Sequence, residues 1–273
     1  MSAINTNVSA LFAQNALKIN ARNMTTAMEQ LSTGRRINSA KDDAAGLAIG
    51  QSMTSQIRGL NQAVRNANDG VNMLQTAEGA MVEQTNMLQR MRELAVQAAN
   101  GTYSSTQRSY LQTEFSELGS QIDDISTDTT WNGINLLTSA TFSFQVGQSS
   151  GQTIDVVIGD MGLTTLAASM TTPSSAISSA TSAQTTLGYL DSALDIINAQ
   201  RATIGAGINR LTYAADNLSN ISANVETSRS TVMDTDYATA STQLSRAQIV
   251  QQAATAMLAQ ANQQPQTVLA LLK

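Results

Sequence analysis

Residues 57–74 read IRGLNQAVRNANDGVNML, and their aliphatic side chains recur at intervals of three and four residues. The same spacing continues to Ala95 and returns between Leu187 and Val225. A period of 3.5 residues that is kept over several heptads winds one helix around another. We therefore predict a mainly α fold, an elongated antiparallel helical bundle or coiled coil. The seam positions are Ile57, Leu60, Val64, Ala67, Val71, Leu74, Met81, Leu88 and Ala95, then Leu187, Leu190, Leu194, Ile197, Ile204, Ile208, Leu211, Ala215, Leu218 and Val225, with Glu78, Thr85, Arg92, Arg201 and Ser222 as polar interruptions.

Weaker helical patterns flank the two seams. The first helix should end at Ser32-Thr33-Gly34, and in the polar connection that follows Ser39 and Asp42 have the spacing of a capping box for the next helix. At the other end of the chain, Pro265 is predicted to kink or end the last helix. The apolar positions of these two helices are Ile4, Val8, Leu11, Met24, Met28 and Leu31, and Ala240, Leu244, Ala247, Ala254, Met257 and Ala261.

The middle of the chain has a different pattern. Ser104 and Gln107 form a second capping-box pair that opens a helix ending near Thr129. Beyond it, apolar residues alternate with polar ones on both sides of residues 147–152, which predicts one small β-hairpin region. The Ser/Thr/Ala-rich residues 163–186 indicate a surface connection or a weak helix start.

The two ends of the chain should not be stable alone. Ordering a residue costs about 1 to 2 kcal/mol, and a buried Leu or Met returns about 1.5 to 3 kcal/mol. The last helix offers mostly alanine along its stripe. We therefore hypothesise a folded middle whose two ends become ordered only when they pack together in neighbouring copies.

Composition excludes several functional classes. The 273 residues include no His and no Cys, which removes disulfides, thiolate metal sites and a Ser-His-Asp mechanism, so we expect no enzyme activity and no cofactor or metal. The net charge is −5 without a basic cluster, which argues against nucleic-acid binding. The sequence has no signal peptide pattern and no apolar stretch long enough for membrane insertion.

Two motifs that could indicate ligand sites have simpler explanations. Gly205-Ala206-Gly207 resembles part of a phosphate loop, but it follows no strand and lies within the heptad pattern, so we interpret it as helix that tolerates close neighbours. Asp123, Asp124 and Asp128 lack the spacing of a calcium loop and are interpreted as a capped, solvated helix end.

Several long runs of this sequence resemble bacterial flagellin. The resemblance covers residues 1 to about 160 and 185 to 273, and the region between them is far shorter than the variable domains of many flagellins. The runs are LSTGRRINSAKDDAAG at 31–46, RNANDG at 65–70, QRMRELAVQ at 89–97, SRS at 228–230, DYAT at 236–239 and QANQQPQTVL at 260–269.

The resemblance implies an inner domain in which the N- and C-terminal helices are paired, and an outer helical domain. The implied divisions are an N-terminal core helix at 1–43, N-terminal helices at 44–130, a hairpin and reduced variable region at 131–175, a C-terminal helix at 176–235 and a C-terminal core helix at 236–273. The core assembly residues would be Ile4, Val8, Leu11, Leu244, Met257, Leu258, Val268 and Leu269.

The resemblance also implies a function and partners. The chain would be a structural subunit of the extracellular flagellar filament, polymerising with other copies for swimming motility. Its partners would be the filament cap protein, hook–filament junction proteins, a cytoplasmic export chaperone that holds the C-terminal segment, and the flagellar type III export apparatus. In the family, the segment matching residues 89–96 contacts other subunits and the host Toll-like flagellin receptor. Carried over by position, the contact residues would be Gln89, Arg90, Leu94 and Glu114.

Two other function classes stay open at this stage. A cell-surface module that binds polysaccharide would need exposed aromatic rings, and the chain has one Trp and five Tyr. Glycan binding by a monomer that does not polymerise would favour this alternative. An enzyme is the weakest option, because the usual catalytic His and Cys are missing; hydrolysis abolished by one Asp or Glu substitution would favour it.

Overall fold

The computed structural model describes residues 7–166 and 176–270, with side chains described as far as Gln263. The chain divides into two compact units, which we name the terminal unit, Met1–Ile57 with Ala223–Lys273, and the central unit, Arg58–Ser222. Both expected inner-domain segments, 1–43 and 236–273, fall within the terminal unit. The division of the chain into five segments stays a prediction.

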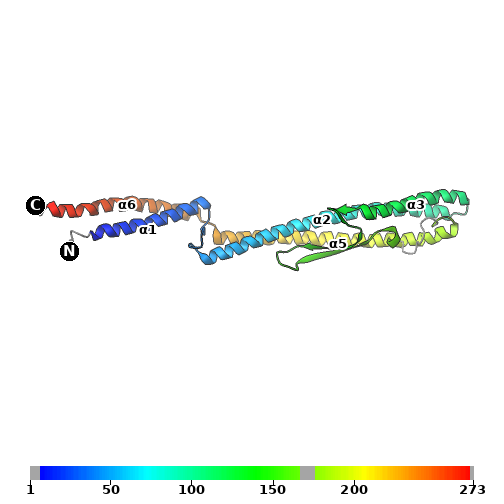
Figure 1. Cartoon of the computed structure of the whole chain (residues 1–273), viewed down its shortest axis with the longest axis horizontal. Coiled ribbons are helices and arrows are strands. Elements are labelled where there is room, and N and C mark those ends of the chain that lie inside the picture. Colours follow the sequence, from blue (N-terminus) through cyan, green and yellow to red (C-terminus); the bar gives the residue numbers. More distant parts are fainter. Residues whose placement is uncertain (1–6, 167–175, 271–273) are drawn as a thin grey trace. The chain divides into compact units, whose positions relative to one another are not determined.

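Three helices form the central unit, and the mainly α fold is confirmed. They are α2 (Ala44–Ala99), α3 (Ser105–Asp128) and α5 (Ala180–Met233); the outer parts of α2 and α5 belong to the terminal unit. The predicted seams are largely buried between α2 and α5, and Phe115 and Ile122 bring α3 onto the same core. In Figure 1, α2 and α5 lie side by side in this unit, and α3 lies along α2.

Four of the five polar interruptions of the two seams lie opposite polar residues, and the fifth, Thr85, donates to the Met81 carbonyl of its own helix. Arg92 pairs with Asp191 at 2.6 Å and Glu78 lies 3.8 Å from Arg201. Ser222 Oγ donates to Asn61 Oδ1 at 3.0 Å. As residue numbers increase along α2, the numbers of the partner residues on α5 decrease, which shows that the two helices are antiparallel.

The predicted hairpin is confirmed as β3 (Thr138–Gln145) and β4 (Thr153–Asp160), paired antiparallel with Phe142 opposite Val156. A second strand pair, β1 (Thr130–Trp131) with β2 (Ile134–Asn135), was not predicted. It turns at Asn132-Gly133, where both residues have positive φ. Asn-Gly is the sequence signal for such a turn and could have predicted this pair. A short helix, α4 (Leu163–Leu166), follows β4, and residues 167–175 of the predicted surface connection lie outside the described residues.

Glycines on the helices let the hairpin lie close to them. A Cβ on Gly70 would be 2.7 Å from the Phe144 ring, and one on Gly207 would be 2.8 Å from Val156. The interpretation of Gly205-Ala206-Gly207 as helix with a close neighbour is therefore confirmed at Gly207. Side-chain amides also hold the strands: Gln200 Nε2 donates to the Val157 carbonyl at 2.8 Å.

The terminal unit contains α1 (Val8–Thr33) and α6 (Tyr237–Ala270), with a short backbone clasp between the segments that follow α1 and precede α6. Arg35 and Asp234 form a β-bridge, which is flanked by hydrogen bonds from Arg36 N to the Met233 carbonyl and from Thr235 N to the Gly34 carbonyl. Gly34 has a φ of 71° and ends α1 as predicted. The clasp fixes which residues of the two terminal helices face each other.

One prediction about a helix start is wrong, and one about a helix end is wrong in part. The carboxylate of Asp42 accepts hydrogen bonds from Ser39 N and Oγ and from Asn38 N, so Ser39 and Asp42 close a turn instead of capping a helix. The hydrogen bond from the Ser39 side chain is the main reason why the pKa of Asp42 is lowered. Asp43 caps α2 instead, accepting from Gly46 N at 2.9 Å. The last helix does not end at Pro265, since α6 continues to Ala270, and a kink at Pro265 stays a prediction.

Replacing Gly207 by Ala should destabilise the central unit, because the new methyl group meets Val156. Overpacking costs about 1 to 3 kcal/mol, which exceeds the gain of about 0.5 to 1 kcal/mol from removing a helical glycine. Thermal unfolding of Gly207→Ala should show a lowered melting temperature. The matched control is Gly205→Ala, two residues away with no atom within 4 Å of its added Cβ. This control should be more stable than wild type, and a rise for both variants would contradict the close hairpin packing.

Candidate functional site

The first candidate surface is the terminal helix pair, which packs through small side chains. Cα atoms of α1 and α6 approach within 8 Å at many points. The buried seam residues are Ala10, Asn20 and Ala27 on α1, and Ala240 and Ala247 on α6. Alanine allows this approach because its side chain is a single methyl group. For the same reason the seam removes little apolar area from water.

Asparagine side chains join the two helices across the seam. Asn20 Nδ2 donates to the Ala247 carbonyl at 2.7 Å, and Asn7 Nδ2 donates to the Ala261 carbonyl at 2.7 Å. Asn7 Oδ1 also accepts from Ala10 N and so caps α1. Sequence reasoning missed both residues. The signal that could have identified Asn20 is its spacing of three and four residues from Leu17 and Met24.

Large apolar side chains lie on the outside of this pair. The prediction that the apolar positions of the first helix form its seam is partly wrong. Val8, Leu11 and Met28 are each more than half exposed. Met257 is also 66% exposed, whereas Leu244 and Leu258 are half-buried. Phe12, Ile19 and Ile249 add to the exposed apolar surface. Ile4, Val268 and Leu269 lie outside the described side chains. The alanine seam turns the larger residues outward, where nothing in the described part of the chain covers them.

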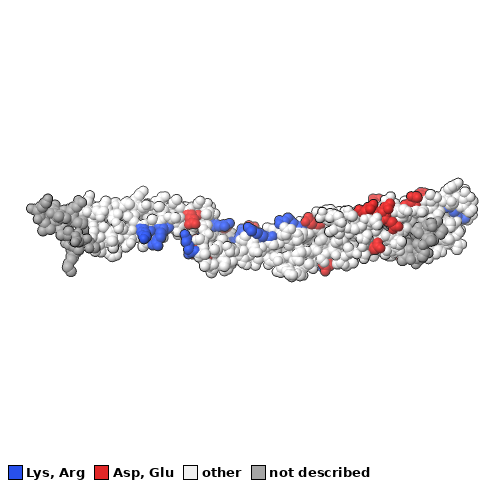
Figure 2. Space-filling view, in the orientation of Figure 1, with Lys and Arg blue, Asp and Glu red and all other residues white. Residues whose placement is uncertain are grey.

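The second candidate surface lies on α2 and α3. Arg90 of α2 bridges two carboxylates, Glu93 on its own helix and Glu114 on α3, each at 2.9 Å. The hydrogen bonds that Arg90 donates to Glu93 and, second, to Glu114 raise the pKa of Arg90. Gln89 is exposed beside it. Figure 2 shows acidic side chains gathered over the part of the central unit where α3 lies. Arg90 itself is a cation held between two carboxylates.

Leu94 does not share this surface. Its side chain is only 1% exposed and belongs to the core cluster of the central unit. Resemblance to the family placed it on one contact surface with Arg90, but its side chain belongs to the same buried cluster as Met91 and Phe115. The expectation that Leu94 contacts a receptor directly is therefore not supported by the geometry. Arg90 and Glu114 are brought together as expected.

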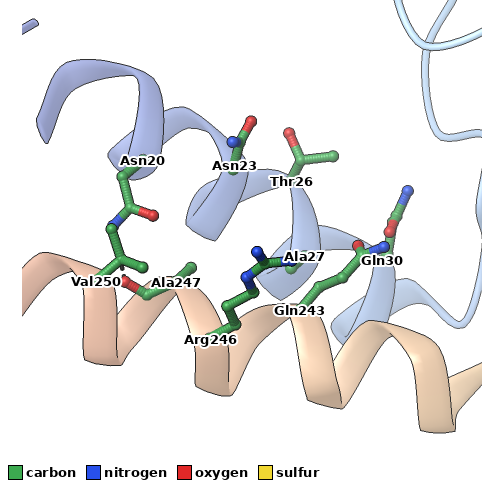
Figure 3. Close-up of a pocket in the computed structure, with 9 residues that line it drawn as sticks. All are labelled: Asn20, Asn23, Thr26, Ala27, Gln30, Gln243, Arg246, Ala247 and Val250. Carbon is green, nitrogen blue, oxygen red and sulfur yellow. Dashed lines mark hydrogen bonds between the residues drawn. The ribbon is translucent and has the colours of Figure 1, made fainter. Parts of the chain in front are cut away.

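Two grooves occur on the terminal unit. One, of about 430 Å³, lies between α1 and α6 and is lined by Asn20, Asn23, Thr26, Ala27, Gln30, Gln243, Arg246, Ala247 and Val250; Figure 3 shows these side chains. The other, of about 620 Å³, is lined mainly by α1 and by residues of the loop before α2, and it contains Lys18, Arg22, Lys41, Glu29 and Asp42. None of the helices in the described part of the chain combines the length and apolar character of a membrane span.

Comparison with known proteins decides the family. The family model of the bacterial flagellin N-terminal helical region matches residues 4–141, and that of the C-terminal helical region matches residues 187–272. The chain belongs to the bacterial flagellin family. The flagellin of Halalkalibacterium halodurans is 42% identical over 272 residues, covering 99% of both chains. The flagellar filament 33 kDa core protein of Treponema phagedenis is 41% identical over 284 residues, again covering 99% of both.

A solved flagellin supports the fold. The crystal structure of Bacillus cereus flagellin aligns with a TM-score of 0.50 and 31% identity, covering 56% of this chain and 88% of that one. The two flagellin family matches include α1, α2 and α3 on one side and most of α5 and α6 on the other. Residues 142–186, between the matches, hold most of the hairpin and α4. The short form expected from the sequence is therefore confirmed, and the curated relatives above match it over nearly their whole length.

Proposed function

We propose that the chain is a flagellar filament subunit that self-assembles through the outer face of the α1–α6 pair. Membership of the flagellin family supports the filament role. The observation that carries the assembly proposal is the exposed apolar surface of the terminal unit, which includes Phe12 at 72% and Ile249 at 66% exposure. Exposed large apolar side chains gathered on one helix pair point to an interaction site.

The energetics of the terminal pair favour assembly. Burying a methyl group returns about 0.8 kcal/mol, which is less than the roughly 1 to 2 kcal/mol needed to order one residue. A seam built mainly from alanine therefore leaves the pair marginal within one chain. Packing of the outer residues against neighbouring copies supplies the missing apolar burial, and this contribution grows with subunit concentration. The central unit has a core of Leu, Ile and Met side chains and folds within each subunit. It then provides lateral contacts between neighbouring subunits.

The proposal extends to export. A subunit with such an exposed surface needs protection before it polymerises, which suits a cytoplasmic chaperone on the C-terminal segment and passage through the flagellar type III export apparatus. Polymerisation would then take place under a filament cap protein, beyond the hook–filament junction proteins. The long helices support this route, because they form from local contacts and can refold quickly after an unfolded passage.

Seeded polymerisation tests the assembly proposal. We expect full-length protein to extend sheared filament seeds, because its outer apolar face can pack on the seed. Protein lacking residues 1–43 and 236–273 should stay soluble, with a helical circular dichroism spectrum from the remaining core. Electron microscopy and sedimentation measure both outcomes. Fibres from both proteins would contradict the proposed role of the terminal helices.

We also propose that Gln89, Arg90 and Glu114 form the contact surface for a host Toll-like flagellin receptor. Arg90 and Glu114 are joined across two helices and their side chains are about half exposed, so they can contact a partner without unfolding. The buried Leu94 would support this surface from beneath.

A receptor-reporter assay with monomeric variants tests this surface. Arg90→Ala should weaken signalling while the melting temperature changes little, because exposed ion pairs add little stability. Leu94→Ala should lower the melting temperature, since truncating a buried Leu costs about 2 to 5 kcal/mol. Arg108→Ala on α3 is the control for loss of an arginine and should keep its signalling. Wild-type signalling by Arg90→Ala would contradict the assignment.

A further inference from the structure

Helix α6 has one charged residue. Between Tyr237 and Ala270, Arg246 is the single Lys, Arg, Asp or Glu, and amides, hydroxyls and alanines supply most of the other side chains. A helix with so little charge is suited to being covered by other protein. The one cation on it therefore needs an explanation.

Arg246 lines the groove between α1 and α6. Figure 3 shows its side chain extending toward α1, near Asn23 and Ala27. Within residues 7–166 and 176–263 it has neither a hydrogen bond nor an ion pair. Asn20, at the side of the same groove, is only 9% exposed, and its amide nitrogen donates to the Ala247 carbonyl. The groove is thus polar, and its cation has no acceptor in the described part of the chain.

The groove continues into the exposed apolar surface. Val250 lines the groove, and Met257 lies seven residues further along α6, on the same helical face. Thr26 lines it from α1, and Ile19 and Phe12 lie seven and fourteen residues before Thr26. A neighbour that covers this apolar strip would also cover Arg246. Covering a guanidinium without providing an acceptor costs several kcal/mol, so the neighbour has to supply one.

We propose that Arg246 donates hydrogen bonds to neutral oxygen atoms, amide or main-chain carbonyl, of a second copy of this chain when terminal units pack together. This inference rests on the proposed filament function. Composition favours neutral acceptors: within residues 8–33 and 237–263 the single carboxylate is Glu29, which lines the other groove with Lys18, Arg22 and Lys41. The other carboxylates of the terminal unit lie outside α1 and α6, at Asp42, Asp43, Glu226, Asp234 and Asp236. A planar guanidinium with five donors can bind several carbonyl oxygens at once.

Variants of Arg246 test the proposal through the critical concentration for seeded polymerisation of the full chain. Arg246→Ala should raise it about ten- to hundredfold, the equivalent of losing hydrogen bonds made by a charged donor. Arg246→Gln keeps two N–H donors without the charge and should cause a smaller rise. Wild-type polymerisation should change less than about threefold between low and high salt, because the acceptors are neutral.

The control is Arg210→Ala, which removes an exposed arginine of the central unit and should polymerise like wild type. Arg246 is exposed in the single chain, so the Arg246 variants should keep the wild-type circular dichroism spectrum and melting temperature. Wild-type polymerisation of Arg246→Ala would overturn the proposal while leaving the filament function intact. Equal defects in the Ala and Gln variants, with strong salt dependence, would overturn the neutral acceptors. Absence of polymerisation by wild type would instead contradict the filament function.

Discussion

The close packing of α1 on α6 through small side chains is the constraint on which the rest of the terminal unit depends. Alanines at the seam bring the two backbones near each other, and Asn20 uses this proximity to reach the Ala247 carbonyl. The consequence is that larger residues such as Phe12 and Met257 point outward. The terminal helices therefore leave an apolar surface that no residue in the described part of the chain covers.

The central unit solves a different packing problem. Its helices bury Leu, Ile, Met and Phe side chains, and four of the five polar interruptions of the seam face polar residues on the opposite helix. Gln84 shows how a buried polar group is used there, since its amide donates to the Ile122 and Met161 carbonyls and joins α2 to the ends of α3 and β4. Such a unit can be stable alone, in contrast to the alanine seam of the terminal pair.

Much of the fold could be predicted from the sequence, because heptad spacing reports directly which side of a helix is buried. It located α2 and α5, and period-two alternation located β3 and β4. Spacing of large apolar residues predicts a seam less well where small residues make the contact. Counting large apolar residues placed Val8 in a seam that Ala10 occupies; on the last helix the predicted positions Ala240 and Ala247 are buried, whereas Met257 is not. Leu94 was assigned to the contact surface through family resemblance; it is not one of the predicted seam positions, and its burial was missed.

The central claim is that the terminal pair is marginal in a single chain and becomes stable through neighbouring copies. Hydrogen–deuterium exchange of the full chain, compared between dilute monomer and filament, tests this most directly. The account predicts that amides of α1 and α6 exchange rapidly in the monomer and slowly in the filament, while amides in the seam of the central unit are protected in both. Equal, strong protection of α1 and α6 in dilute monomer would contradict it.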